Sequence, residues 1–222
     1  MSEQRDKNLW IFNAGNSFAG NPKWMFEYII RHHKEIKPVW MCYNADTMNY
    51  VHKLGYEAEL YHSSKGKSVM AKAGVYVVEM CKEVFQPELS GITVLNLWHG
   101  VGCKSIERKV TDGFLQERIA KKYIQNNDIL RNNQLFLVTS EIMEKHFKEQ
   151  CGIDDDKVIR AGYPRCVVND NIQSYDHDIR KKKGLSANTK LAIYCPTYRD
   201  NNGANFMKSA LPDMKRLAEV LH

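Results

Sequence analysis

Residues 96–105 place an imidazole, two glycines, a lysine and a hydroxyl at the end of a stretch that is typical of a buried strand. The segment reads Asn-Leu-Trp-His-Gly-Val-Gly-Cys-Lys-Ser and overlaps the apolar run 92–97. In an open parallel sheet the ligand crevice lies beyond the carboxyl ends of the strands. This order predicts that His99 and Lys104 lie at a substrate site, with a loop or packing role for the histidine as the alternative interpretation.

Two nucleotide-binding patterns fail in this segment. A phosphate-binding P-loop has the form G-x-x-x-x-G-K-[ST], whereas Cys103 separates Gly102 from Lys104 and no glycine stands five residues before Gly102. The dinucleotide pattern G-x-G-x-x-G begins at Gly100, but Ser105, after Lys104, stands where its third glycine belongs. What remains is an imidazole beside a lysine.

Composition places the chain among globular proteins with a sizeable core, because it has 222 residues of which 43% are hydrophobic and 26% charged. Six cysteines fall at wide, irregular spacings without a C-x-x-C pair. The sequence therefore indicates neither a disulfide framework nor a zinc site, and it predicts a reducing compartment. No apolar run approaches the roughly 18 residues of a membrane span, so we expect a cytoplasmic protein.

The net charge of +6 is unevenly distributed. Basic residues gather at Lys104, Arg108 and Lys109, at 121–122, and in the run 180–183. Such clusters attract anionic partners, which include phosphate substrates, nucleic acid and the cytoplasmic lipid surface. The alternative interpretation of the run 180–183 is the solvated face of a helix.

Strand and helix patterns alternate along the first 170 residues. Short apolar runs predict strands at 9–12, 39–42, 57–61, 75–79, 92–97, 135–139 and 157–161. Between them, amphipathic segments predict helices with these boundary residues: Asn21 and Asp46 as N-terminal caps, Gly55 and Gly74 as ends, and Ser140 as a further cap. A further helical period covers 114–124. The alternation predicts an α/β fold with a doubly wound, mostly parallel Rossmann-like sheet.

The pattern changes near residue 170. We expect a first domain at 1–170, a polar and basic linker at 171–189, and the incomplete start of a second domain at 190–222. The last part offers one strand, 191–195, and one helical stretch, 207–221. One strand and one helix cannot cover their own apolar faces. Either this segment packs on the first domain or the chain is the front part of something longer.

Six short motifs extend along nearly the whole chain: Trp10-Ile11-Phe12, Asn21-Pro22-Lys23-Trp24-Met25-Phe26-Glu27-Tyr28-Ile29, Pro38-Val39-Trp40, Trp98-His99-Gly100 with Lys104, Gly162-Tyr163-Pro164-Arg165, and Pro196-Thr197-Tyr198-Arg199-Asp200. In this order and at this spacing they resemble the CDP-glycerol glycerophosphotransferase family, which includes teichoic acid primases and polymerases and related capsule polymerases. Each motif is weak alone, but six in register are specific.

The resemblance implies a GT-B-type fold of two facing Rossmann-like domains, of which this chain supplies the acceptor-side domain and the start of the donor-side domain. It implies transfer of glycerol phosphate from CDP-glycerol to a lipid-linked or polymeric glycerol phosphate acceptor at the inner face of the cell membrane, without nucleic acid and without a cofactor. His99 matches the family's histidine and would act as general base. Lys104 would neutralise phosphate charge.

Four further residues are candidates for substrate binding. Arg165 and Arg199 each offer a planar fork to phosphate oxygens, with a structural ion pair as the alternative role. Asn13 and Ser17, in the turn after the first predicted strand, are candidates for lining the acceptor side, with ordinary turn chemistry as the alternative. No metal ligand is assigned.

The sequence also departs from the family pattern. Where the family commonly continues Thr-Pro-Leu-Lys after His-Gly, this chain has Val101-Gly102-Cys103-Lys104. The donor-binding residues of the family belong to the later domain, so we assign none here and expect the chain alone to be inactive. Two alternatives remain open: a GT-B glycosyltransferase that uses a nucleotide sugar, and a non-catalytic binding remnant.

Overall fold

The computed structural model describes residues 5–80, 87–102, 104–113, 116–120, 134–166, 179–193 and 210–221. The chain divides into two units, Met1–Asn171 and Ile172–His222. Each unit is described by itself below.

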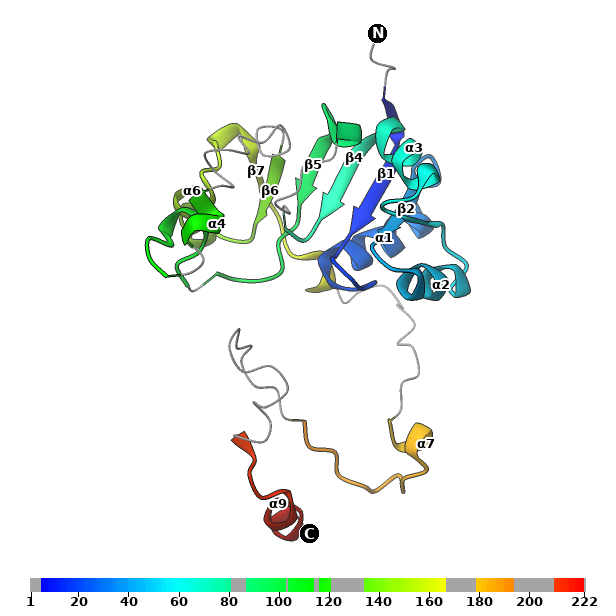
Figure 1. Cartoon of the computed structure of the whole chain (residues 1–222), viewed down its shortest axis with the longest axis vertical. Helices are drawn as coiled ribbons and strands as arrows, with labels where there is room; N and C mark the ends of the chain where they lie inside the picture. Colours follow the sequence, from blue (N-terminus) through cyan, green and yellow to red (C-terminus); the bar gives the residue numbers. More distant parts are fainter. Residues whose placement is uncertain are drawn as a thin grey trace. The chain divides into compact units, whose positions relative to one another are not determined.

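The first unit is built on a seven-stranded parallel sheet (Figure 1). Its strands are β1 (Asp6–Asn13), β2 (Lys37–Cys42), β3 (Ala58–Leu60), β4 (Ala73–Val78), β5 (Thr93–Asn96), β6 (Gln134–Val138) and β7 (Val158–Arg160). Every neighbouring pair is parallel, and the spatial order is β3-β2-β1-β4-β5-β6-β7. The strand order therefore reverses between β1 and β4, as in doubly wound folds. The predicted fold class is confirmed.

Helices connect these strands and cover both faces of the sheet. They are α1 (Gly20–His32), α2 (Ala45–Lys53), α3 (Ser64–Lys72), α4 (Gln116–Ala120) and α6 (Glu141–Cys151). Short 3-10 turns follow at η1 (Pro87–Leu89), η2 (Glu107–Lys109), η4 (Asp155–Lys157) and η5 (Pro164–Cys166). Of the predicted helix 114–124, residues 116–120 are helical and the others lie outside the described residues.

Each face of the sheet has its own core. Consecutive residues of a strand point to opposite faces, so Ile11 and Phe12 of β1 belong to different apolar clusters. Phe26 and Ile29 of α1 pack on the Phe12 side, and Met70 of α3 packs on the Ile11 side. Burying a side chain of this size contributes roughly 1.5–3 kcal/mol. The sheet is therefore held from both faces, and its carboxyl-terminal edge is left for polar residues.

Two predicted N-terminal caps are wrong. Helix α1 begins at Gly20 with Ala19 at the N-cap, so Asn21 lies inside the first turn instead of before it. Helix α2 is capped by Asn44, whose side chain accepts a hydrogen bond from the Thr47 amide at 2.8 Å. Each predicted cap lies two residues after the observed one, because several polar residues adjoin each helix.

The predicted helix end at Gly74 is also wrong, whereas two other boundaries are confirmed. Gly74 lies within β4, and its missing side chain lets the backbone of Asp6 pass close by. Gly55 follows α2 with a φ of +82°, as a helix-ending glycine should. Ser140 caps α6 by accepting from the Met143 amide at 3.3 Å.

The second unit contains two described helices, α7 (Ile179–Lys183) and α9 (Met214–Leu221). The basic run 180–183 forms most of α7, so its interpretation as a helix is confirmed. The predicted strand is not present at 191–193, which are exposed and irregular, while residues 194–195 lie outside the described residues. Of the predicted helix 207–221, residues 214–221 are helical, 211–213 are not because Pro212 cannot continue a helix, and 207–209 lie outside the described residues.

Candidate active site

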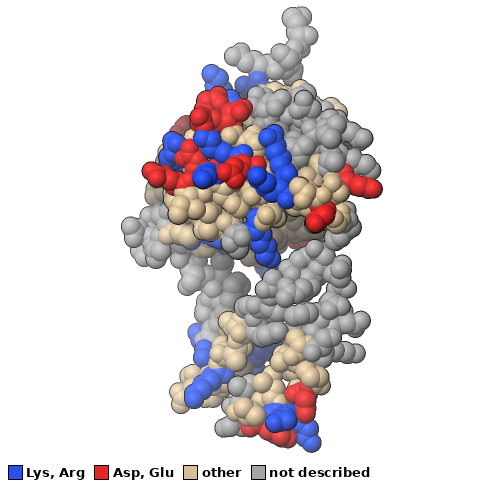
Figure 2. All heavy atoms as spheres, turned by 90° about the vertical axis from the view of Figure 1, so that its left-hand side faces the viewer, with Lys and Arg blue, Asp and Glu red and all other residues tan. Residues whose placement is uncertain are grey.

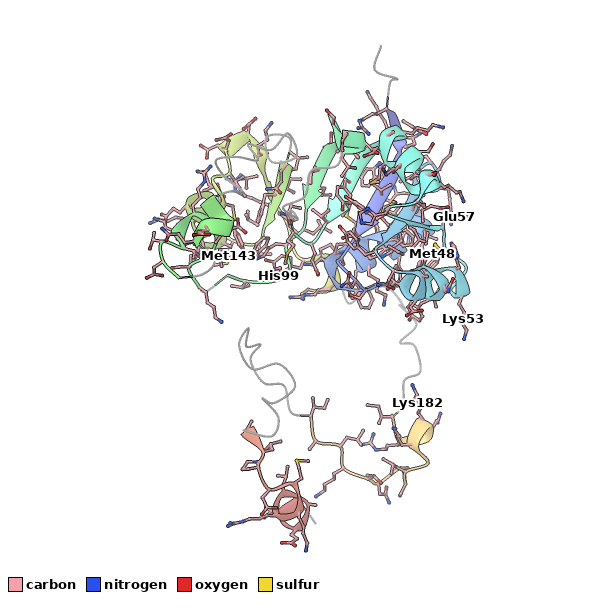
Figure 3. All side chains as sticks on the ribbon, viewed as in Figure 1. Met48, Lys53, Glu57, His99, Met143 and Lys182 are labelled. Atoms are coloured by element: carbon pink, nitrogen blue, oxygen red, sulfur yellow. The ribbon has the colours of Figure 1, made fainter. Side chains whose placement is uncertain are left out.

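His99 lies just beyond β5 at the carboxyl-terminal edge of the sheet (Figure 3). The preceding residue, Trp98, is buried against Phe136 and Phe147, with ring centroids 5.6 and 5.3 Å away. Its indole stacks on the imidazole of His99 with centroids 4.5 Å apart. The residue as a whole is exposed, although the stacked indole withdraws part of the imidazole from water. The buried indole thus anchors the loop and presents the histidine at the sheet edge.

The backbone of Trp98 is held in a left-handed conformation, with a φ of 50°. This region is rarely adopted by a bulky residue and costs on the order of 1–3 kcal/mol. Buried hydrogen bonds hold it there. The Trp98 amide donates to Asn96 Oδ1 at 2.9 Å, and the Asn96 side chain donates to Gln134 Oε1 at 3.1 Å. The turn that carries His99 is therefore fixed by β5 and β6 together.

Asn21 connects the His99 turn to two other segments. Its fully buried amide donates to the Trp98 carbonyl at 2.7 Å. Its Oδ1 accepts the backbone N–H of Arg165 at 3.4 Å, and its own N–H donates to Glu79 Oε1 at 3.2 Å. Three strand ends, those of β4, β5 and β7, thus meet at the start of α1.

Arg165 lies beside the His99 turn. The Tyr163 hydroxyl donates to the Gly100 carbonyl at 2.8 Å, and the Arg165 guanidinium lies over the Tyr163 ring at 5.7 Å. A Cβ at Gly100 would lie 3.3 Å from a terminal nitrogen of Arg165. Arg165 is exposed, and no carboxylate of the described residues forms an ion pair with it. This geometry favours the phosphate-binding alternative over the ion pair.

The other predicted residues stand in different situations. Lys104 is exposed and makes no hydrogen bond or ion pair within the described part of the chain. Asn13 is buried, and its amide donates to the Met41 carbonyl at 2.8 Å while its Oδ1 accepts from the Gly15 amide. Ser17 is exposed and pairs with Ala14 through the backbone. Both turn residues fit ordinary turn chemistry. Arg199 lies outside the described residues.

Glu79 is a site residue that the sequence analysis missed. It follows β4 directly, and β4 and β5 run side by side up to Val78 and Asn96. The strand-order reversal lies between β1 and β4, so this position is where doubly wound folds place ligand contacts. Knowledge of the strand order would have identified it, but a single apolar run does not reveal that order.

The charges around His99 act in opposite directions. Withdrawal of the imidazole from water lowers the pKa of His99, the negative charge of Glu79 raises it, and the positive charge of Arg165 lowers it. The net effect is a pKa below the ordinary value of about 6.5. A neutral imidazole can accept a proton, so His99 is available as a base at neutral pH.

Two other kinds of site, a metal centre and a membrane-spanning helix, have no candidate among the described residues. No group of three or more His, Cys, Asp or Glu side chains in the described ranges is arranged to hold a metal ion. None of the helices in those ranges has the length and hydropathy needed to cross a bilayer. Figure 2 shows basic and acidic side chains mixed on the face that carries α6. There the Arg160 guanidinium donates two hydrogen bonds to the Glu144 carboxylate, each of 2.7 Å.

Curated relatives point to one class of enzyme. A teichoic acid poly(glycerol phosphate) polymerase of Bacillus subtilis (strain 168) is 25% identical over 201 residues, which cover 84% of this chain and 25% of that protein. Another protein of that name, from Bacillus spizizenii, is 21% identical over 214 residues, covering 89% of this chain and 52% of that protein. The chain therefore spans about half or less of the length of these relatives.

Solved structures of the wall teichoic acid polymerase TagF share the fold. One superposes with a TM-score of 0.69 at 20% identity, covering 89% of this chain and 49% of that chain. A variant soaked with CDPG gives a TM-score of 0.71 over 91% of this chain and 50% of that chain. The model of the CDP-Glycerol:Poly(glycerophosphate) glycerophosphotransferase family matches residues 1–222. Since this match extends over the entire chain and includes the His99 turn, the chain belongs to that family.

Proposed function

We propose that the protein transfers glycerol phosphate from CDP-glycerol to a glycerol phosphate polymer or its lipid-linked precursor, and that the first unit is its acceptor side. The family match and the relatives' names support this reaction class. The second unit would begin the donor-side domain, because its described residues, 179–193 and 210–221, contain no strand.

In this reaction the acceptor hydroxyl attacks the β-phosphate of CDP-glycerol. A new phosphorus–oxygen bond forms, the bond to the bridging oxygen of the diphosphate breaks, and CMP leaves. His99 takes the proton of the hydroxyl as the new bond forms. Arg165 lies within reach of the same turn, and its guanidinium offsets the charge that spreads over the phosphoryl oxygens. Lys104, in the same loop, adds a second positive charge at the surface.

One observation carries the proposal: an imidazole with a lowered pKa and a guanidinium that pairs with no carboxylate among the described residues lie together at the carboxyl-terminal edge of the sheet. An imidazole alone is common in loops. An imidazole beside an exposed guanidinium combines a proton acceptor with a phosphate ligand.

We also place the protein in the cytoplasm, at the inner face of the membrane, because a lipid-linked acceptor has to be reached from there. The basic helix α7 supports this placement. Its lysines are exposed, and Ile179 and Leu185 beside them are 51% and 43% exposed. Basic and apolar side chains side by side are typical of surfaces that bind anionic lipid.

The test uses His99→Ala in the protein made from its complete reading frame. We expect turnover of CDP-glycerol with a glycerol phosphate oligomer to fall about 10²- to 10⁴-fold, the usual contribution of a general base. The transfer of labelled glycerol phosphate measures it. His32→Ala is the matched control, because His32 is exposed on the last turn of α1, away from the site. Turnover of the His99 variant within threefold of the unmodified protein, with folding intact, removes His99 from the mechanism.

A further inference from the structure

Glu79 accepts a hydrogen bond at the N-terminus of helix α1, where the helix has no capping side chain of its own. The first turn of α1 contains no acidic residue, and Ala19 at its N-cap has no side chain that can accept a hydrogen bond. The first amides of a helix lack partners within the helix and carry partial positive charge. Glu79 reaches across from the end of β4, and its Oε1 accepts the Asn21 amide at 3.2 Å.

Gly20 makes this approach possible. A Cβ built at Gly20 would lie 1.7 Å from Glu79 Oε1 and 2.4 Å from its Cδ, so any other residue would displace the carboxylate. Gly20 also has a φ of +68°, which other residues adopt only with strain. Both properties of the position thus agree with a carboxylate held against the helix end.

The same carboxylate acts on His99. Asn21 binds Glu79 through its backbone and the carbonyl of Trp98 through its side chain, so one residue fixes the distance between the carboxylate and the His99 turn. Two charged side chains act on His99. Glu79, directly after β4, raises the His99 pKa, and Arg165 of η5 lowers it. Lys104 lies farther along the same loop, and His146 of α6 packs against Gly102.

Helix N-termini at a strand-order reversal commonly bind the phosphate of a ligand. Here that position already holds a carboxylate. We propose that Glu79 is a positioning residue: its carboxylate serves as the built-in anion of the α1 N-terminus, acts through space on His99, and keeps phosphate groups away from this helix end. The exclusion of substrate phosphate rests on the proposed function, whereas the action on His99 does not.

The first experiment is an NMR titration of the His99 ring in the chain 1–222, as the unmodified protein and as Glu79→Gln. Glutamine keeps the hydrogen-bond acceptor for Asn21 but removes the charge. We expect the His99 pKa to be lower in the variant, because the charge that favours the imidazolium is gone. The difference should shrink as salt is added. An unchanged or higher His99 pKa overturns the proposal.

Two controls separate this effect from general changes. Glu57→Gln removes the same charge from an exposed position beside β3, far from His99 (Figure 3), and should leave the His99 pKa unchanged. Arg165→Met should raise the His99 pKa, the opposite sign. If Glu79→Gln does not fold, the unmodified protein still provides a test. The chemical shift of the Asn21 amide must change when a carboxyl group is protonated at acid pH, and an unchanged shift overturns the contact.

The second experiment uses inorganic phosphate as the probe and reads the Gly20 and Asn21 amides. We expect phosphate to perturb these amides in Glu79→Gln and not in the unmodified protein. If phosphate shifts these amide signals equally in the two proteins, or shifts them in neither, the exclusion of phosphate is overturned. Neither experiment measures transfer. If both effects are found while the protein made from its complete reading frame shows no transfer, the proposed function is wrong and the role of Glu79 stands.

Discussion

The side chain of Asn21 joins segments that are far apart in the sequence. It is fully buried, and its amide nitrogen faces two carbonyl oxygens, those of Trp98 at 2.7 Å and Leu97 at 3.4 Å. A buried amide between such partners makes hydrogen bonds that no carboxylate can replace, because a carboxylate has no donor. Asn21 therefore fixes the position of the His99 turn relative to α1.

We predict that Asn21→Asp lowers the free energy of unfolding by about 1–3 kcal/mol, since it leaves buried carbonyls without their donor and places a negative charge beside them. Urea unfolding at neutral pH measures the change. Asn49→Asp is the control, because Asn49 is exposed on α2 and the same substitution there should have little effect. A loss for Asn21→Asp no larger than that of the control would contradict this role.

At the scale of single residues, the sequence predicted part of the candidate site. His99 and Arg165 were identified from the segments that follow strands, and the structure brings these two residues together. Glu79 was not identified, because the register of β4 beside β1 and β5 decides its place and a single strand pattern does not reveal it. Asn13 was read as a candidate for the acceptor side, but its amide holds the turn after β1.

At the scale of elements, β4 shows why a glycine alone does not locate a helix end. Helix α3 ends at Lys72, and β4 begins at the next residue. A Cβ at Gly74 would lie 2.6 Å from the Asp6 carbonyl oxygen, in a stretch where the pairing of β1 and β4 changes register. The glycine is needed because two backbones pass closely, a tertiary contact that local sequence does not show.

We therefore predict that Gly74→Ala lowers the free energy of unfolding by about 1–3 kcal/mol through overpacking. Thermal and urea unfolding of the chain 1–222 measure it. Gly162→Ala is the matched control: a Cβ there meets nothing within 4 Å and its backbone is not left-handed, so its effect should be neutral or slightly stabilising. Equal stability of the two variants would show that the strands move apart at no cost.

For the whole molecule, the distribution of charge matters more than its sum. The face over α6 mixes both signs (Figure 2), and Lys148 there contacts Glu144 at 3.5 Å. Helix α7, by contrast, has four consecutive basic residues, Arg180–Lys183, with exposed lysines. A surface with both signs attracts an anionic membrane weakly, so α7 is the better candidate for lipid contact.

We predict that the chain 1–222 cosediments with phosphatidylglycerol vesicles, weakly with phosphatidylcholine vesicles, and less as salt increases. Lys182,Lys183→Gln should weaken the binding roughly 30-fold, since each lysine near the surface contributes about 1 kcal/mol. The control is Lys53,Lys72→Gln, two exposed lysines of the first unit (Lys53 and Lys182 are labelled in Figure 3). Equal binding to the two lipids would rule out an electrostatic membrane contact.

The hydrogen bond from the Arg165 amide to Asn21 spans 144 positions of the chain. Contacts of such separation form late in folding, because the intervening chain has to be ordered first. During synthesis, the helix that holds one end of this bond leaves the ribosome long before the turn that supplies the other. A nascent chain can thus contain β1 and α1 while the partners that complete the site, and the Leu137 and Tyr163 side chains of the shared core, are not yet made. The candidate site is complete only when the turn after β7 has been made, which ties its assembly to the last step in building the sheet.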